Sequence, residues 1–141
     1  MRHQVWDISQ LDDFFCVVEK MARDVVRGVV YLKGDLGAGK TALVQHWLKS
    51  LGVAEPVTSP SYQIVNHYAA NGKRFIHADL YRLADAEELL YLDVRDWTEQ
   101  ADLIFIEWPE KGDGYLPAPD VICQLFLADG QRILHCDLQA P

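Results

Sequence analysis

The sequence predicts an α/β fold in which helices flank a mixed sheet and antiparallel hairpins extend it. Three observations lead to this prediction. A β-branched and aromatic run at residues 29–32 passes through a Gly-rich segment into a helical pattern at residues 40–51. Turn sequences with Gly at residues 70–73 and 128–131 each separate two strand-like runs. An apolar run at residues 103–106 adds a buried strand, so we expect parallel and antiparallel strands in one sheet.

The N-terminal part reads as a strand followed by a helix. Residues 3–7 are expected to form a short strand, and residues 9–23 a helix with Ser9 as its N-cap. Asp12 and Asp13 suit the first turn, because the N-terminus of a helix carries a partial positive charge. The apolar face of this helix is expected to hold Leu11, Phe14, Phe15, Val18 and Met21.

The other elements follow from turn and stop signals. Gly28 ends the first helical segment, and Gly52 is the stop signal after the helix at residues 40–51. The remaining elements are, in chain order, a loop at 57–60 between Pro56 and Pro60, a hairpin of 62–68 and 74–77, a helix at 84–92 with Glu87 and Glu88 outside, the strand at 103–106, a Gly- and Pro-rich loop at 112–119, and a hairpin of 121–127 and 132–138.

The charge of the chain limits its partners. Twenty-one Asp and Glu oppose thirteen Lys and Arg, which gives a formal net charge of -8. Proteins that bind nucleic acid directly usually present a basic face to the phosphates. We therefore expect contact with any nucleic acid to be indirect, through a partner protein. With no membrane-length apolar run and no N-terminal signal pattern, a cytoplasmic location without a membrane partner is expected.

The cysteines do not indicate a metal site. Cys16, Cys123 and Cys136 are too far apart in sequence for C-x-x-C spacing, and the five histidines show no zinc-ligand spacing. Cys123 and Cys136 stand in the two arms of the last predicted hairpin, where a disulfide is conceivable. Reduced, buried thiols are the interpretation we favour for a cytoplasmic protein.

A Gly-rich segment carries the strongest chemical signal. Residues 34–41, GDLGAGKT, match the P-loop pattern G-x-x-x-x-G-K-[ST] at every fixed position, between a predicted strand and a predicted helix. The backbone N–H groups of such a loop surround phosphates, so glycine is needed where a side chain would obstruct them. We interpret residues 1–141 as a single P-loop nucleotide-binding domain. The expected ATP-binding residues of the loop are Leu36, Gly37, Ala38, Gly39, Lys40 and Thr41.

Acidic residues at strand ends are candidates for magnesium binding and catalysis. Lys40 is expected to reach the β- and γ-phosphates, and the Thr41 hydroxyl to coordinate Mg²⁺. Glu107 follows the apolar strand 103–106, at the end that faces the ligand crevice in open α/β sheets. It is expected to act as a direct metal ligand, a water-mediated ligand or a general base, against the alternative of a solvated loop glutamate. Asp79 closes another strand-like run, and its alternatives are a helix N-cap or a salt bridge with Arg82.

Four further residues complete the predicted site. Thr58 lies in a polar loop stiffened by proline, where a hydroxyl can sense the γ-phosphate; an ordinary turn is the alternative. Glu110 and Arg132 are additional candidates for nucleotide binding. Trp108 stands beside the presumed site, either as a core residue or as an exposed contact for a partner protein. Lys40, Asp79 and Glu107 are the candidate catalytic residues, and Thr41 and Glu107 the candidate metal ligands.

Four short motifs together resemble one bacterial family. They are residues 34–41, residues 58–62 (TSPSY), residues 77–82 (HADLYR) and residues 106–110 (IEWPE). In this order and spacing they resemble the TsaE (YjeE) family, and the resemblance covers nearly the whole chain. This sequence departs from the family pattern at four positions, Ala42, Ser61, Tyr62 and Ala78, where the family often has other residues. None of these departures removes a chemical group to which we assign a role.

The resemblance implies a specific role. The TsaE family contains ATPases of tRNA threonylcarbamoyladenosine biosynthesis, with a P-loop NTPase-like fold and extra antiparallel strands. Its members hydrolyse ATP slowly alone and work with TsaB-like and TsaD-like proteins on adenosine 37 of tRNAs that read codons beginning with A. The functional positions of the family correspond here to Lys40, Thr41, Thr58, Asp79, Glu107 and Trp108. The implied cofactors are ATP and Mg²⁺, and tRNA is met only through the partners.

Two other functions fit a P-loop chain of this length. A small-molecule kinase would need a lid and an acceptor pocket, and no Arg-rich lid segment stands out in the sequence. A nucleotide-gated binding module without physiological turnover needs only different affinities in two conformations. If phosphate appears only as free inorganic phosphate, the kinase is excluded. Measuring which partner binds the ATP form and which binds the ADP form distinguishes the binding module from an ATPase.

Overall fold

The computed structural model describes residues 2–35, 37–58 and 64–138. The expected ATP-binding residue Leu36, and Ser59, Pro60, Ser61 and Tyr62 of the predicted switch loop and hairpin, lie outside the described residues. The elements are, in chain order, β1 (Arg2–Asp7), α1 (Leu11–Asp24), β2 (Gly28–Lys33), α2 (Lys40–Ser50), β3 (Val65–Ala70), β4 (Lys73–Asp79), η1 (Ala86–Leu92), η2 (Val94–Asp96), α3 (Trp97–Gln100), β5 (Leu103–Glu107), η3 (Pro109–Gly112), β6 (Val121–Ala128) and β7 (Gln131–Leu138).

A single mixed sheet organises the described part of the chain. Its seven strands run in the order β1-β7-β6-β2-β5-β4-β3. The four inner strands β6, β2, β5 and β4 are parallel, while the pairs β1–β7, β6–β7 and β3–β4 are antiparallel. The predicted α/β class with a mixed sheet and terminal hairpins is therefore confirmed. Within the described ranges, no helix has the length and apolar character needed to cross a membrane.

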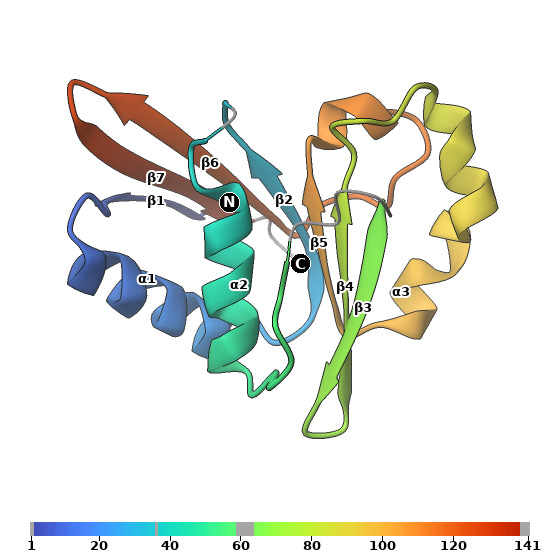
Figure 1. The fold of residues 1–141 in the computed structure, drawn as a ribbon, viewed down its shortest axis with the longest axis horizontal. Helices are drawn as coiled ribbons and strands as arrows, with labels where there is room; N and C mark the ends of the chain where they lie inside the picture. Colours follow the sequence, from blue (N-terminus) through green and yellow to red (C-terminus); the bar gives the residue numbers. More distant parts are fainter. Residues whose placement is uncertain (1, 36, 59–63, 139–141) are drawn as a thin grey trace.

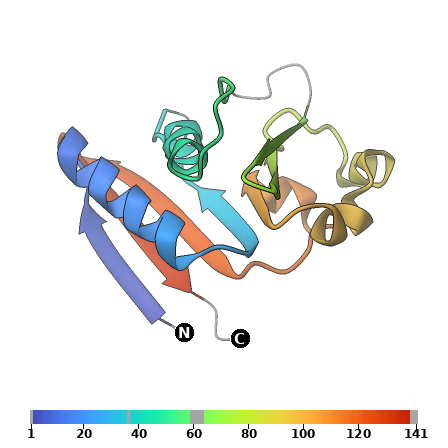
Figure 2. The ribbon, with the colours of Figure 1, turned by 90° about the horizontal axis from the view of Figure 1, so that it is seen from below.

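Helices cover the two faces of this sheet unequally. Helices α1 and α2 lie side by side on one face, and the segment from η1 to α3 packs on the other face beside β4 and β5 (Figure 1, Figure 2). Strand β5 shows how the sequence produces both layers. Leu103 and Phe105 point toward α2, whereas Ile104 and Ile106 point toward α3, so all of β5 is buried.

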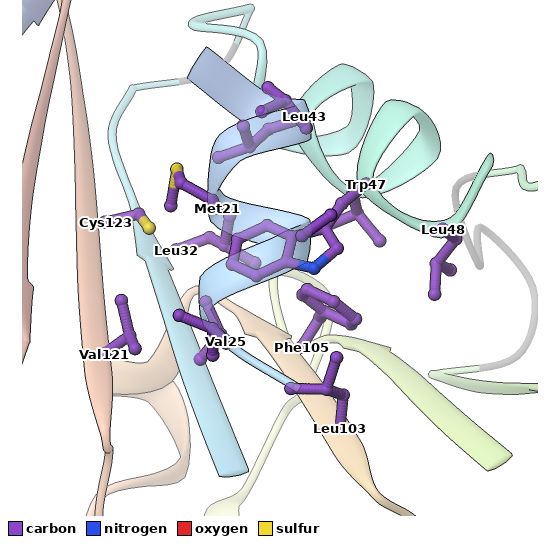
Figure 3. Close-up of a cluster of buried hydrophobic side chains, with 14 of the residues drawn as sticks. Met21, Val25, Leu32, Leu43, Trp47, Leu48, Leu103, Phe105, Val121 and Cys123 are labelled. Atoms are coloured by element: carbon purple, nitrogen blue, oxygen red, sulfur yellow. The ribbon is translucent and has the colours of Figure 1, made fainter. Parts of the chain in front are cut away.

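The larger of the two cores lies under α1 and α2. Trp47 of α2 is fully buried and meets Phe105 edge-on, with 5.1 Å between the ring centroids (Figure 3). Cys123 and Cys136 lie at the edge of this core, directly opposite each other on β6 and β7. Both are free thiols with 3.4 Å between the sulfur atoms, in agreement with the favoured reduced state. Hydrogen bonding to Cys136 and burial raise the pKa of Cys123.

The first helix begins later than the sequence predicted. Its N-cap is Gln10, so the prediction of Ser9 as N-cap is wrong. The Ser9 hydroxyl instead donates to Asp7 and accepts a hydrogen bond from the Arg132 backbone N–H, at 2.8 Å. The buried face of α1 carries Val17, Val18, Met21 and Ala22. Leu11 is the first residue of α1 and is 64% exposed, so it does not belong to the buried face on which the sequence predicted it.

In the second half of the chain, one predicted turn is confirmed and one predicted helix needs refinement. The β3–β4 hairpin turns through Asn71 and Gly72, which both have positive φ, as the Asn-Gly pair predicted. The helix predicted at residues 84–92 is a 3-10 helix, η1, that starts after Asp85. A capping box explains where η1 starts. The Asp85 carboxylate accepts a hydrogen bond from the Glu87 backbone N–H, and the Glu88 carboxylate accepts from the N–H groups of Ala84 and Asp85. The short helices η2, α3 and η3 were not predicted.

Candidate nucleotide-binding site

The site forms where three parallel strands end together. Strand β2 leads into the P-loop, β5 ends at Glu107 and β4 ends at Asp79. The strand register places Glu107 opposite Leu32 on one side and opposite Asp79 on the other. This edge, at the carboxyl ends of the parallel strands, is where open α/β sheets bind ligands.

The backbone of the P-loop requires its glycines. Gly37 and Gly39 have φ values of 80° and 105°, in the left-handed region that glycine tolerates best. Gly39 is also the N-cap of α2. The Arg132 guanidinium lies beside it, and a Cβ on Gly39 would stand 3.4 Å from that guanidinium. The loop thus exposes backbone, rather than side chains, at the positive end of α2.

Lys40 is folded back into the loop that precedes it. Its ammonium donates to the carbonyl oxygens of Gly34 and Asp35, the latter at 3.1 Å. The same ammonium lies 4.1 Å from the centroid of the Trp108 ring, a cation–π contact. Burial lowers the pKa of Lys40, while the nearby carboxylates, Glu107 foremost, oppose that shift. Phosphate oxygens are stronger acceptors than these carbonyl oxygens and can replace them.

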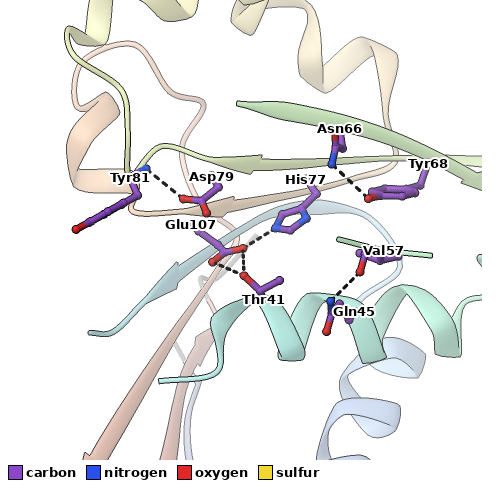
Figure 4. A network of polar contacts seen from close by, with 9 residues as sticks. All are labelled: Thr41, Gln45, Val57, Asn66, Tyr68, His77, Asp79, Tyr81 and Glu107. Carbon is purple, nitrogen blue, oxygen red and sulfur yellow. Dashed lines mark hydrogen bonds and ion pairs between the residues drawn. The ribbon is translucent and has the colours of Figure 1, made fainter. Parts of the chain in front are cut away.

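Thr41 and Glu107 meet beneath the P-loop. The Thr41 hydroxyl lies 3.1 Å from each carboxylate oxygen of Glu107, and Glu107 is only 2% exposed (Figure 4). The alternative of a solvated loop glutamate is therefore excluded. A hydroxyl and a carboxylate are hard oxygen ligands of the kind that Mg²⁺ prefers, so these two residues fit the metal of a P-loop site.

His77 completes this buried contact and was given no role from sequence. Its Nε2 lies 2.6 Å from Oε2 of Glu107, and its side chain is fully buried (Figure 4). The signal that could have found it is a histidine in the middle of an apolar strand, between Ile76 and Ala78. A buried imidazole at such a position needs a polar partner, and the nearest acid in the adjacent parallel strand is Glu107.

A cleft of about 270 Å³ joins most of the predicted residues. Its wall also includes Ala42 and Tyr81, which the sequence did not indicate. The Tyr81 ring lies 5.0 Å from the Trp108 ring, so the two aromatic side chains form one side of the cleft above Lys40. Trp108 is half-buried: it packs against the smaller core and also forms part of the wall of the site. The predicted residues that line the cleft are Gly37, Gly39, Lys40, Thr41, Asp79, Glu107 and Trp108.

Arg132 lies next to the cleft although it is distant in sequence. Its backbone is held at the start of β7 by Ile8, whose N–H donates to the Arg132 carbonyl at 2.9 Å, and by Ser9. Its guanidinium lies beside Gly39 of the P-loop, 3.4 Å from the position that a Cβ on this residue would take. Its buried Nε has no hydrogen-bond partner within the described ranges, so it is available to an anion bound at the loop.

Besides Arg132, three described residues that were predicted to bind nucleotide lie outside the cleft. The Ala38 side chain is buried in the core, and only its backbone faces the loop, where its N–H donates to Asp35. Glu110 is exposed and borders a second cleft of about 300 Å³, between Tyr31 and η3. Thr58 is exposed and does not line the cleft. For these three residues, their position along the chain did not predict whether the side chain lines the cleft.

Carboxylates outnumber cations around the phosphate position. Among the described residues that line the cleft, two acids, Glu107 and Asp79, oppose one cation, Lys40. A triphosphate that entered this cleft alone would meet strong repulsion from these acids. A divalent cation bound with the nucleotide relieves it, so the charge balance of the cleft fits a metal–nucleotide complex better than a free nucleotide.

Comparison with known proteins agrees with the motifs. The family model described as threonylcarbamoyl adenosine biosynthesis protein TsaE matches residues 8–137. The chain is 45% identical over 104 residues to the tRNA threonylcarbamoyladenosine biosynthesis protein TsaE of Haemophilus influenzae, covering 74% of this chain and 66% of that protein. It is 34% identical over 125 residues to the protein of the same name from Aquifex aeolicus, covering 86% and 85%.

Further comparisons give a relative that matches a shorter part of the chain and a solved structure. The TsaE protein of Nostoc is 41% identical over 87 residues, covering 59% of this chain and 53% of that protein. The chain thus spans about half to two thirds of the length of the Haemophilus and Nostoc relatives. A crystal structure of Bacillus subtilis YdiB superposes with a TM-score of 0.78 at 20% identity, over 99% of this chain and 87% of that one. It shares the fold described above.

Proposed function

The chain belongs to the TsaE family, and on that premise we propose that it is a slow ATPase that supports threonylcarbamoylation of adenosine 37 in tRNAs reading codons beginning with A. The observation that carries the proposal is the arrangement of Lys40, Thr41 and Glu107 at one end of the sheet. These are the three groups that a P-loop enzyme needs for phosphate and metal. The relatives are named for the same tRNA modification.

Each residue has a distinct part in the proposed reaction. Lys40 leaves the carbonyls of its own loop and binds the β- and γ-phosphates, while the backbone N–H groups of the loop and the Arg132 guanidinium surround the phosphates. Thr41 and Glu107 would hold Mg²⁺, which when bound neutralises charge on the phosphates. Asp79 is half-buried in the same cleft, where its carboxylate can orient the attacking water.

The contact between Glu107 and Thr41 favours one of the roles left open for the acid. A carboxylate within 3.1 Å of the P-loop hydroxyl is placed to share a metal with it. A general base would instead need to face the attacking water beyond the γ-phosphate. We therefore assign metal binding to Glu107 and water orientation to Asp79.

Slow turnover by the isolated chain follows from the composition of the cleft. Among the described residues that line it, Lys40 is the one cation; Arg132 lies beside the loop at Gly39, so it is placed for the bound phosphates and not in the wall of the cleft. In many P-loop enzymes an arginine supplied in trans stabilises the transition state. We propose that TsaB-like and TsaD-like proteins complete the site in this way in the cytoplasm. The net charge of -8 fits a chain that meets tRNA only through these partners.

Steady-state release of phosphate tests this proposal. The isolated chain is expected to hydrolyse MgATP slowly, and addition of the TsaB-like and TsaD-like proteins to raise kcat at least about tenfold, because a group supplied in trans acts mainly on the transition state. Bovine serum albumin at equal mass serves as the control protein. A rate that the partners leave unchanged would favour the nucleotide-gated binding module, and phosphate transferred to a metabolite would favour the kinase.

A further inference from the structure

We propose that His77 is a positioning residue that fixes which oxygen of Glu107 faces the metal position. The inference rests on the proposed function, since it concerns how the magnesium ligand is oriented. It adds a residue to the site for which the motif pattern gave no role. Three features support this role of His77: the strand register, the unequal contacts of the two Glu107 oxygens, and the surroundings of the other imidazole nitrogen.

The register of β4 and β5 brings the two side chains together. His77 lies opposite Phe105, and Asp79 lies opposite Glu107, so His77 and Glu107 are diagonal neighbours on adjacent parallel strands. Phe75 and Phe105, at alternate positions of the same strands, point into the core under α2. His77 and Glu107 therefore project to the face that the first turn of α2 covers, where Thr41 lies.

Burial makes a donor to Glu107 necessary. His77 is fully buried and Glu107 is 2% exposed, so water cannot solvate the carboxylate from this side. An unpartnered buried carboxylate is costly. Thr41 has one hydroxyl hydrogen and can satisfy only part of the acceptor capacity of Glu107. The short contact from Nε2, 2.6 Å long, is of the kind made by charge-assisted hydrogen bonds.

The two oxygens of Glu107 have different partners. Thr41 lies 3.1 Å from both and so does not distinguish them. His77 contacts Oε2 and not Oε1. With Oε2 held by the imidazole, rotation of the carboxylate is blocked and Oε1 is left as the oxygen that can face a metal. Thr41 alone would permit either oxygen to take that position.

The other imidazole nitrogen identifies the form of the ring. Nδ1 of His77 is buried and has no hydrogen-bond partner among the residues that the structure describes. A buried N–H without an acceptor would be costly, whereas a bare nitrogen there loses less. The contacts therefore assign the hydrogen to Nε2, which donates to Glu107. Buried partners of this kind orient metal ligands, and their loss typically lowers metal affinity by about 10- to 100-fold.

The test compares variants that differ in where they place an N–H donor. His77→Gln puts an amide nitrogen near the position of Nε2, whereas His77→Asn carries the same amide one methylene shorter, and His77→Leu removes the donor. The measurement is the affinity of a fluorescent ATP analogue, titrated at a series of Mg²⁺ concentrations and also in EDTA. Thermal unfolding of each variant shows whether it folds, and the Gln and Asn variants keep the test valid if the Leu variant does not.

The expected result separates metal binding from nucleotide binding. His77→Asn and His77→Leu should raise the Mg²⁺ concentration that half-saturates tight nucleotide binding by about 10- to 100-fold. His77→Gln should restore it to within a few-fold of the wild-type value, and all variants should bind equally in EDTA. An unchanged Mg²⁺ dependence in the Asn variant, or no rescue by Gln, would overturn the inference alone. A wild-type protein that binds no MgATP would overturn the proposed function itself.

Discussion

Replacement of Lys40 by alanine is expected to weaken ATP binding by about 100-fold or more. Lys40 is the one cation that lines the cleft within the described residues, and only 5% of it is exposed. Its two hydrogen bonds to loop carbonyls would be exchanged for charge-assisted bonds to phosphate. Two such bonds contribute on the order of 3 kcal/mol together, which corresponds to a factor of about 100 in affinity.

Titration with a fluorescent ATP analogue in Mg²⁺ measures this effect directly. Lys49→Ala is the matched control, because Lys49 lies on the same helix, α2, but is exposed in its last turn. It should bind the analogue as the wild type does. Wild-type affinity in a folded Lys40→Ala protein would show that the nucleotide does not bind at this loop.

Replacement of Glu107 by glutamine should reduce hydrolysis far more than nucleotide binding. Glutamine has nearly the same volume and can still contact Thr41 and His77, but it lacks the negative charge that holds a metal. We expect kcat to fall by about 100- to 1,000-fold, the range found when one group that stabilises charge in the transition state is lost. At saturating Mg²⁺, the dissociation constant for ATP should change by less than about tenfold, since Lys40 and the loop remain.

Paired measurements of kcat and of the ATP dissociation constant test this expectation. Asp79→Asn, which changes the other acid of the cleft, should likewise lower kcat more than affinity. Glu99→Gln is the control, because Glu99 is exposed on α3, on the other face of the sheet. Full kcat in the Glu107→Gln protein, measured with the partner proteins present, would exclude the metal-binding role of this carboxylate.

Much of the fold could be predicted because its signals are local. The complete burial of β5 requires only an apolar run, and the β3–β4 turn requires only Asn71 and Gly72. The start of α1 could not be placed, because the hydroxyl of Ser9 accepts its hydrogen bond from the backbone N–H of Arg132, which is distant in sequence. The short helices η2, α3 and η3 have three or four residues each, too few to produce a helical period in the sequence.

The residues of the candidate site also differ in whether a local sequence signal identifies them. Lys40, Thr41 and Glu107 could be identified because motif spacing and strand ends are readable from the sequence. His77 and Tyr81 were missed as site residues because their roles depend on which strands are neighbours and on where a loop returns. Arg132 was named as a nucleotide-binding candidate, but its place beside Gly39 depends on the last hairpin crossing back to the P-loop. Thr58 and Glu110 lie near the site in sequence, yet not in the cleft.

Multiple-turnover threonylcarbamoylation of tRNA tests the central claim most directly. Purified TsaB-like and TsaD-like proteins, a threonylcarbamoyl-adenylate synthase, threonine, bicarbonate, MgATP and excess tRNA would be incubated with wild-type chain, with Lys40→Ala or without the chain. The modified adenosine formed per TsaD-like protein is then counted. We expect much more modified adenosine with the wild type than with Lys40→Ala or without the chain, and equal amounts in the last two. Equal product with and without the wild-type chain would contradict this claim.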